Sequence, residues 1–259
     1  LVLPSVYTIL EDVGMATADK MEAGRQANRL RSALSDAVMR IAAKVGKAQG
    51  RLRPADIARK AVGDFVTKVD LRSEQQLRRE LTKLQPQAGF LGEETEVAGL
   101  DNDWLWVVDP IDGTSNFARG LPHFAVSAAL LFRGQPVLAA IHCAPEDALY
   151  TAVHGMGAWR NRRRIEAPRG RFDDGAILGC QWFRGQQDMR FLTQLQSKGA
   201  RIRTLGSTVV QLADVVRGRL DRPPGWRAGG RVGPPVHDGL GQLAINLDVP
   251  GAREPRPEP

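Results

Sequence analysis

Near the middle of the chain, an apolar run ends on acidic residues, in the stretch 104–117, which reads WLWVVDPIDGTSNF. The β-forming residues at its start predict a buried strand. Pro110 removes the next donor from the strand ladder, so we expect the strand to stop there. The strand therefore ends on the carboxylate of Asp109.

The residues that follow add a second carboxylate and groups that begin a helix. Asp112 precedes Gly113, which permits a positive φ and a close backbone approach, and Thr114 and Ser115 can cap a helix. Carboxylate oxygens hold hard divalent metals, while N–H groups at a helix start hold anions. The stretch therefore suits a cation and a phosphate together. Taken alone, the same residues are also typical of a polar turn of the Asp-Pro and Asp-Gly kind.

A second group of acids favours the cation over the simple turn. Glu93 and Glu94 follow residues 89–91, a short apolar segment that predicts the end of a neighbouring strand. Carboxylates about 5 Å apart repel by on the order of 3 kcal/mol per pair at an effective dielectric of about 20, so a positive charge must lie among them. The cluster has oxygen donors and no His or Cys pair, which indicates magnesium or manganese rather than zinc.

The order of these motifs resembles the inositol monophosphatase family of magnesium-dependent, lithium-sensitive phosphatases. The resemblance rests on GEE at 92–94 followed by WVVDPIDGTSNF. Further matches are DFVTKVD at 64–70, GLP at 120–122, GMGAWRNRRRI at 155–165 and LGS at 205–207. A motif in its expected strand and turn context is more specific than the same letters alone. The likeness covers residues 30–221 and leaves residues 1–29 as an N-terminal extension without an assigned role.

The resemblance implies an α/β fold, the layered αβαβα sandwich of the sugar phosphatase superfamily, and a homodimer. The pattern of the chain agrees, because amphipathic helical stripes alternate with β-rich segments. Helices are expected at Leu30–Val45 and Leu71–Leu84, and Asp70 or Ser73 is expected to start the second. Ser207 is expected to cap a third helix that ends near Leu220. Strands are expected over 123–132, 136–143, 148–153, 176–180 and 201–205, with a helix over 189–198.

The resemblance also implies a set of metal ligands. In the family, carboxylates equivalent to Glu93, Asp109 and Asp112, with the Ile111 carbonyl, hold two or three magnesium ions, for which manganese is an alternative. Ions held about 3.5 to 4 Å apart lower the pKa of a bound water and stabilise the leaving oxygen. The catalytic candidates are therefore Glu93, which binds the first ion and helps to polarise the water, and Asp70 and Thr114, which orient it.

The same likeness implies a substrate site and a reaction. The residues expected to bind the phosphate or the substrate hydroxyls are Asp112, Gly113, Thr114, Gly206, Ser207 and Thr208. The implied activity is hydrolysis of a small phosphorylated metabolite, the phosphate monoester of a polyol or sugar such as inositol monophosphate. A histidinol-phosphatase-type relative in the same family is the alternative.

The composition predicts a soluble globular protein, with 42% apolar residues among 259. Its formal net charge of +7 would help to draw in a phosphorylated metabolite. The basic run at 160–164 lacks interleaved aromatics and favours a solvated hairpin over a nucleic-acid site. Residues 1–10 predict neither a signal peptide nor a membrane span, and Cys143 and Cys180 are expected to be buried thiols. We therefore expect a cytoplasmic protein.

The resemblance stops after residue 221. The family continues into a Trp-Asp pair whose Asp completes the second metal site, whereas residues 222–259 lack that pair and hold eight of the 16 prolines. Such a tail predicts irregular structure instead of the expected core helix. Our hypothesis is a shifted reading frame or a truncated gene after about Asp221. An uninterrupted frame on resequencing, with the matching protein mass, would contradict it.

If the tail is genuine, weaker magnesium binding and reduced turnover are expected. The alternative from another class is a binding or regulatory protein that keeps the fold without efficient catalysis. The missing Trp-Asp pair and the basic surface favour this alternative, whereas the intact GEET and DPIDGTSNF stretches favour the enzyme.

Overall fold

The computed structural model describes residues 17–61, 64–95, 97–166, 175–179 and 186–221. Its main element is a seven-stranded sheet in the order β3-β4-β5-β6-β7-β8-β9. Strand β3 is parallel to β4, and every other neighbouring pair is antiparallel. The strands are β3 (Gly89–Gly92), β4 (Trp104–Asp112), β5 (Ala125–Phe132), β6 (Gln135–Cys143), β7 (Ala148–Val153), β8 (Gly157–Arg160) and β9 (Arg163–Ile165).

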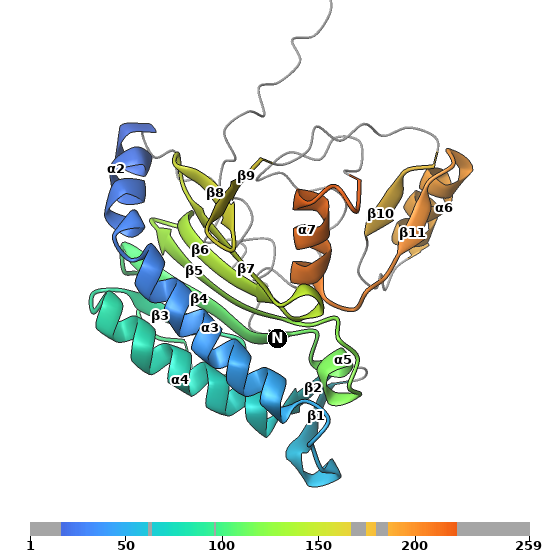
Figure 1. Cartoon of the computed structure of the whole chain (residues 1–259), viewed down its shortest axis with the longest axis horizontal. Coiled ribbons are helices and arrows are strands. Elements are labelled where there is room, and N and C mark those ends of the chain that lie inside the picture. Colours follow the sequence, from blue (N-terminus) through green and yellow to red (C-terminus); the bar gives the residue numbers. More distant parts are fainter. Residues whose placement is uncertain (1–16, 62–63, 96, 167–174, 180–185, 222–259) are drawn as a thin grey trace, which may run out of the picture.

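Helices cover both faces of this sheet (Figure 1). On one face pack α2 (Thr17–Asn28), α3 (Arg31–Ala48) and α4 (Lys68–Leu84). On the other face lies α7 (Thr208–Val216), and beyond it stand the parallel pair β10 (Ile177–Gly179) and β11 (Arg201–Arg203), then α6 (Gln186–Ser197). The layers alternate as α/β/α/β/α, which confirms the predicted fold class.

Because both faces are covered, the central strands are apolar on both sides. In β4, Trp106 and Val108 join the core under α3 and α4, whereas Leu105 and Val107 join the core under α7. This division follows from the alternation of side chains along a strand. The acidic residues of β4 therefore lie at its C-terminal end, at Asp109 and Asp112.

Two of the predicted helices form where the apolar spacing placed them. In α3 one buried stripe runs along the helix, with Leu34, Ala37, Val38, Ile41, Ala42 and Val45 enclosed, which confirms the prediction. Helix α7 begins after Ser207, whose hydroxyl accepts the Val210 N–H, so the predicted cap is confirmed too. The helix ends at Val216 rather than near Leu220 as predicted. Residues 17–28, for which the sequence indicated no role, form α2 and bury Ala23 and Ala27 in the same core as α3.

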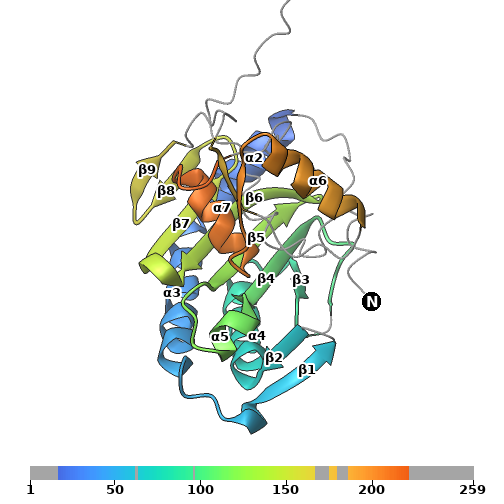
Figure 2. The same ribbon diagram turned by 90° about the vertical axis from the view of Figure 1, so that its right-hand side faces the viewer.

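The predicted start of α4 was wrong. Its cap is Thr67, the last residue of β2 (Asp64–Thr67), rather than Asp70 or Ser73. Strand β2 pairs with β1 (Ile57–Ala61), and the pair lies at the bottom of Figure 2. The Thr67 side chain accepts the N–H groups of Val69 and Asp70, and the Asp70 carboxylate accepts the Thr67 N–H at 3.0 Å. This reciprocal capping box satisfies the first donors of the helix and fixes its start.

The predicted end of the central strand was also wrong. Strand β4 continues past Pro110 to Asp112 instead of stopping at Asp109. Its register against β5 shifts between Asp109 and Asp112, so the proline sits in an irregularity where no ladder donor is needed. The helix that follows, α5 (Thr114–Ala118), begins after Gly113 at a φ of 95°, with no capping bond from the Gly113 position.

The remaining sequence predictions concern the surface and the cysteines. The basic run forms the β8–β9 hairpin, as predicted, with Asn161 and Arg162 at positive φ in its turn. Residues 161–164 are exposed, whereas Arg160 is half-buried. Cys143 is a buried free thiol whose pKa is raised by burial. Cys180, the first ten residues and the proline-rich tail lie outside the described residues. Within those described residues, no helix has the length and apolarity to span a membrane.

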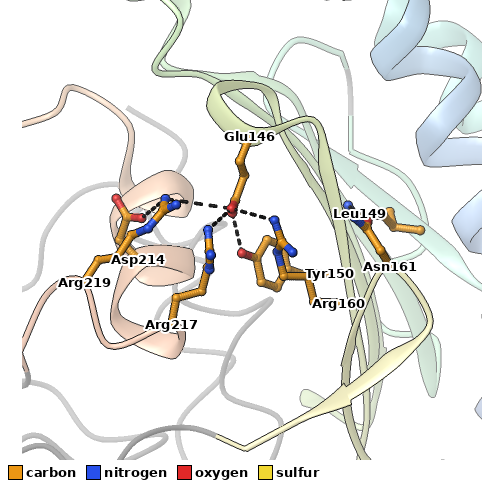
Figure 3. Close-up of polar contacts among 8 residues, drawn as sticks. All are labelled: Glu146, Leu149, Tyr150, Arg160, Asn161, Asp214, Arg217 and Arg219. Atoms are coloured by element: carbon orange, nitrogen blue, oxygen red, sulfur yellow. Dashed lines mark hydrogen bonds and ion pairs between the residues drawn. The ribbon is translucent and has the colours of Figure 1, made fainter.

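The turn between β6 and β7 joins the sheet to α7 through one carboxylate. Glu146 accepts hydrogen bonds from the Tyr150 hydroxyl, from Arg160 Nη2 at 3.0 Å and from Arg217 just beyond α7 (Figure 3). Arg219 Nη1 lies 3.8 Å from the same carboxylate. Burial opposes the charge of Glu146, but these hydrogen bonds and the arginine charges outweigh it and hold its pKa below the usual value. Glu146 thereby ties α7 to β7 and β8.

Replacing Glu146 by Gln should lower the free energy of unfolding near pH 7 by about 1 to 2 kcal/mol, because hydrogen bonds to a charged group contribute about 1.5 to 3 kcal/mol and the amide keeps part of them. The folded-state pKa lies below the unfolded value of about 4.5, so this stabilisation is present above pH 4.5 and lost as the pH falls through the folded pKa. The difference between wild type and variant should therefore shrink in acid.

Urea denaturation near neutral pH and in steps below pH 4.5 measures both effects. The matched control is Glu22→Gln, because the ion pair of Glu22 with Arg25 is exposed and should contribute little. A constant difference between wild type and Glu146→Gln across the pH range would contradict the prediction.

Candidate active site

Acidic residues gather where the parallel strands β3 and β4 end. Their last pairing joins Gly92 to Val108, so Glu93 and Asp109 follow at the same end of the sheet. Glu93 is exposed, whereas Asp109 is 7% exposed and Asp112 is 8% exposed. Parallel pairing thus brings together acids from two separate sequence motifs.

The acids around Asp109 act on its pKa. Burial raises the pKa of Asp109 well above its ordinary range, and the charges of Glu93, Asp112 and Asp70 raise it further. One hydrogen bond, from the Ile111 N–H to Asp109 Oδ1 at 2.9 Å, acts in the opposite direction. A divalent cation would lower the pKa of Asp109, because it favours the ionised form of every acid around it.

The donor chemistry of this end of the sheet fits a hard cation. The groups are carboxylate and carbonyl oxygens, which magnesium and manganese prefer. Within the part of the chain that the structure describes, no three Asp, Glu, His or Cys side chains already enclose a common point. The acids are therefore within electrostatic reach of one another without forming a closed ligand set.

A hydroxyl bridges the end of β4 to the start of α4. Thr114 Oγ1 lies 3.1 Å from Asp70 Oδ1 and 2.9 Å from the Ile111 carbonyl oxygen, so its one proton is shared between two acceptors. The other carboxylate oxygen of Asp70 accepts from the N–H and the hydroxyl of Thr67. Burial raises the pKa of Asp70, against the hydrogen bonds from Thr67 and Thr114 that lower it. Asp70 is only 1% exposed, and its position is fixed from both sides.

Asp112 connects the end of β4 to the start of α7. Its Oδ2 accepts the hydroxyl of Ser207 and the N–H of Val209 at 2.8 Å, and its Oδ1 accepts the N–H of Thr208 at 3.3 Å. A negative charge at this position also interacts favourably with the positive end of the helix dipole. The sheet therefore positions α7 through the same carboxylate that belongs to the acidic cluster.

Two glycines let the starts of α5 and α7 approach each other. A Cβ at Gly113 would lie 2.8 Å from the His123 carbonyl oxygen, and one at Gly206 would lie 2.8 Å from Asn116 Nδ2, so both positions require glycine. The Asn116 amide donates to the carbonyl oxygens of His123 at 2.7 Å and Leu205 at 2.8 Å. Asn116 thus holds the segment before α7 against α5.

The structure brings every site candidate from the sequence to this end of the sheet. The polar candidates are linked to one another by the hydrogen bonds described above, and Glu93 is linked through its effect on Asp109. The two glycines face each other, because a Cβ at Gly113 would lie 3.2 Å from the Gly206 carbonyl oxygen. The candidates are Asp70, Glu93, Asp109, Ile111, Asp112, Gly113, Thr114, Gly206, Ser207 and Thr208. Sequence reasoning missed Thr67 and Asn116. The spacing Thr-x-x-Asp of a capping box could have indicated Thr67, but nothing local indicates the distant partners of Asn116.

Comparison with known proteins agrees with this geometry. The model of the inositol monophosphatase family matches residues 26–226. The chain belongs to the inositol monophosphatase family. Among its relatives, the inositol-1-monophosphatase of Rhizobium meliloti is 37% identical over 202 residues, which cover 74% of this chain and 76% of the relative. The Nus factor SuhB of Escherichia coli K12 is 36% identical over 172 residues, 64% of each chain.

Solved structures of this family share the fold. The suhB protein of Bartonella henselae matches with a TM-score of 0.66 at 32% identity, covering 74% of this chain and 76% of that one. The IMPase of Thermotoga maritima matches with a TM-score of 0.67 at 27% identity, covering 75% of this chain and 74% of that one. The five-layer arrangement is therefore the inositol monophosphatase fold.

Replacing Ser207 by Ala should lower the free energy of unfolding by about 1 to 2 kcal/mol, because the variant loses the N-cap of α7 together with its bond to Asp112. Chemical denaturation measures the change. Ser197→Ala is the control, since that hydroxyl donates to the Gln194 carbonyl on the exposed end of α6. Equal losses in the two variants would mean that Ser207 does not anchor α7.

Proposed function

We propose that this protein is a magnesium-dependent phosphomonoesterase that hydrolyses the phosphate ester of a small polyol or sugar, such as inositol monophosphate. The observation that carries the proposal is the burial of Asp109 among three further acids, next to the starts of two helices. Acids suit a divalent cation and helix starts suit an anion, so one place accommodates both parts of a metal–phosphate complex.

The residues that would hold the metal are Glu93, Asp109, Asp112 and the carbonyl of Ile111. Two or three magnesium ions are proposed, with manganese as an alternative. When bound, these ions lower the pKa of a water towards neutrality and stabilise charge on the leaving oxygen. The three hydrogen bonds from α7 to Asp112 are compatible with a metal ligand, because a carboxylate offers about four lone-pair positions.

Asp70 and Thr114 are proposed to orient the attacking water. The Thr114 hydroxyl is held between Asp70 and the Ile111 carbonyl, so the direction of its lone pairs is fixed. Asp70 is held through its other carboxylate oxygen by the Thr67 N–H, so the oxygen that faces Thr114 has a fixed position. Glu93 is proposed to help polarise the same water.

The two helix starts are proposed to bind the substrate. The amides of Gly113 and Thr114 would receive the phosphate at the start of α5, next to Asp112. At the start of α7, Gly206 and Thr208 are proposed to lie near the substrate hydroxyls or phosphate. Ser207, which is fully buried, acts there by holding Asp112.

The substrate class and the setting come from relatives. The name inositol-1-monophosphatase of the Rhizobium meliloti relative supports a polyol phosphate, and histidinol phosphate is the alternative. A cytoplasmic homodimer is the proposed form of the protein. A second candidate function is a binding or regulatory protein that keeps the fold, which the name Nus factor of the Escherichia coli relative favours.

Release of inorganic phosphate tests the enzyme directly. The panel is inositol monophosphate, histidinol phosphate, fructose bisphosphate and phosphoadenosine phosphate, each with magnesium chloride and with a chelator. Wild type should release phosphate only with magnesium. Asp109→Asn should be slower by about 100-fold or more, because changes to groups that merely support a metal ligand already cost about 10- to 100-fold.

The matched control is Asp101→Asn, an exposed acid in the turn before β4, which should keep the wild-type rate. No magnesium-dependent release by folded protein on any of the four esters would refute the enzyme and favour the binding protein. A gel shift with RNA at graded salt then tests that function, because binding driven by phosphate charge weakens steeply as salt rises.

A further inference from the structure

Glu74 is a fully enclosed acid in the second turn of α4. None of its surface is exposed, and it lies on the same buried side of the helix as Asp70, Leu77 and Leu81. An ionisable group in such a place is unfavourable unless its contacts compensate for the loss of water. Its contacts therefore indicate why the position is acidic.

The Glu74 carboxylate contacts the chain on both sides of Glu93. Its Oε2 accepts the N–H of Glu94 at 2.8 Å. It also presses against Gly92, where a Cβ would come within 2.3 Å of Glu74 Oε1 and 2.6 Å of Oε2. Position 92 is therefore restricted to glycine by the Glu74 carboxylate.

Glu93 and Glu94 lie beyond the ladder that orders β3. The last pairing of β3 with β4 is at Gly92, after which the chain bends at residues 93–95. The strand alone does not determine where the Glu93 carboxylate lies. Contacts at Gly92 and Glu94 hold the backbone of Glu93, because that backbone runs between them.

We propose that Glu74 is a positioning residue that sets the location of Glu93 for metal binding. The inference rests on the proposed function, in which Glu93 is a metal ligand. Magnesium requires nearly ideal octahedral geometry, so small displacements of one ligand weaken binding strongly. Glu74 acts through the backbone, by the hydrogen bond to Glu94 and by the packing on Gly92.

The other oxygen of Glu74 supports a role beyond stability. Glu74 Oε1 is buried and has no hydrogen-bond partner within the described residues. A buried acceptor without a donor costs about 1 to 3 kcal/mol, and this cost offsets what the hydrogen bond from the Glu94 N–H contributes to stability. What this side chain provides beyond filling the core is its hold on residues 92 and 94, on either side of Glu93.

Magnesium affinity, measured by titration calorimetry with magnesium chloride, tests the inference without relying on turnover. Glu74→Ala removes both contacts and should weaken binding about 10- to 100-fold, as expected for loss of a group that orients a ligand. Glu74→Gln keeps the shape and the acceptor for the Glu94 N–H, so it should bind within about twofold of wild type. Magnesium binding by Glu74→Gln as weak as that of Glu74→Ala would overturn the proposal.

Gly92→Ala tests the contact between Gly92 and the Glu74 carboxylate from the other side. The added methyl group must push the enclosed carboxylate off the Glu94 N–H, so this variant should lose magnesium affinity as Glu74→Ala does. In the double variant Gly92→Ala with Glu74→Ala, the methyl group no longer meets a carboxylate. The loss of magnesium affinity in the double variant should therefore be smaller than the product of the two single losses. Independent, multiplying effects would contradict a shared contact.

A control on the same helix separates positioning from general loss of stability. Glu80 accepts a hydrogen bond from Arg40 on α3 at 2.6 Å, away from Gly92. Glu80→Ala should therefore lower stability but leave magnesium affinity unchanged. If Glu80→Ala weakens magnesium binding as much as Glu74→Ala, the effect of Glu74 is only structural.

The Asp109→Asn variant in the same titrations distinguishes the two proposals. If wild type binds magnesium, Asp109→Asn abolishes the binding and Glu74→Ala leaves it intact, only the role of Glu74 is refuted. No binding by wild type, or equal binding by wild type and Asp109→Asn, would sink the proposed metal site and the role of Glu74 with it.

Discussion

Repulsion among enclosed carboxylates is the constraint on which the rest of the structure depends. Asp109 is buried, and three other acids act on it. The parallel pairing of β3 with β4 creates this situation, because it places the ends of two acidic motifs side by side. Both faces of the sheet are apolar, so the strands can carry such groups only at their ends. The fold therefore maintains a concentration of negative charge that a protein interior normally avoids.

Helix α7 is held by charged groups at both ends. At its start the carboxylate of Asp112 accepts from Ser207, Thr208 and Val209, and beyond its end Arg217 donates to Glu146. A negative charge at the start of a helix and a positive charge at its end both complement the helix dipole. The two carboxylates come from β4 and from the turn between β6 and β7, so the sheet and its connection position both ends of the helix. Any substrate site at the start of α7 consequently shares its geometry with the acidic cluster.

Local patterns predicted the parts of the structure that local forces determine. The 3.6-residue spacing located α3, and the acids Glu93 and Asp109 converged because each directly follows the last parallel pairing of β3 with β4. The cap of α4 and the continuation of β4 past Pro110 were missed, because a neighbouring threonine and a register shift decided them. The bonds from Asn116 to Leu205 and from Ser207 to Asp112 join positions 89 and 95 residues apart. Only the packed layers bring such groups together, so no local pattern could have located them.

The sequence of helix α4 contains a pattern that indicates the site, because two acids lie in its buried stripe. Asp70, Glu74, Leu77 and Leu81 follow the spacing of one helical stripe, and all of them are buried. Acids at the first two positions of an otherwise apolar stripe conflict with the requirements of a core, and such conflicts are expected at functional sites. These two acids lie in the first turns of α4, next to the end of the sheet where β3 and β4 end. The Asp70 carboxylate contacts Thr114, and the Glu74 carboxylate contacts Glu94. The helix that covers the sheet therefore also supplies part of the frame around its acidic end.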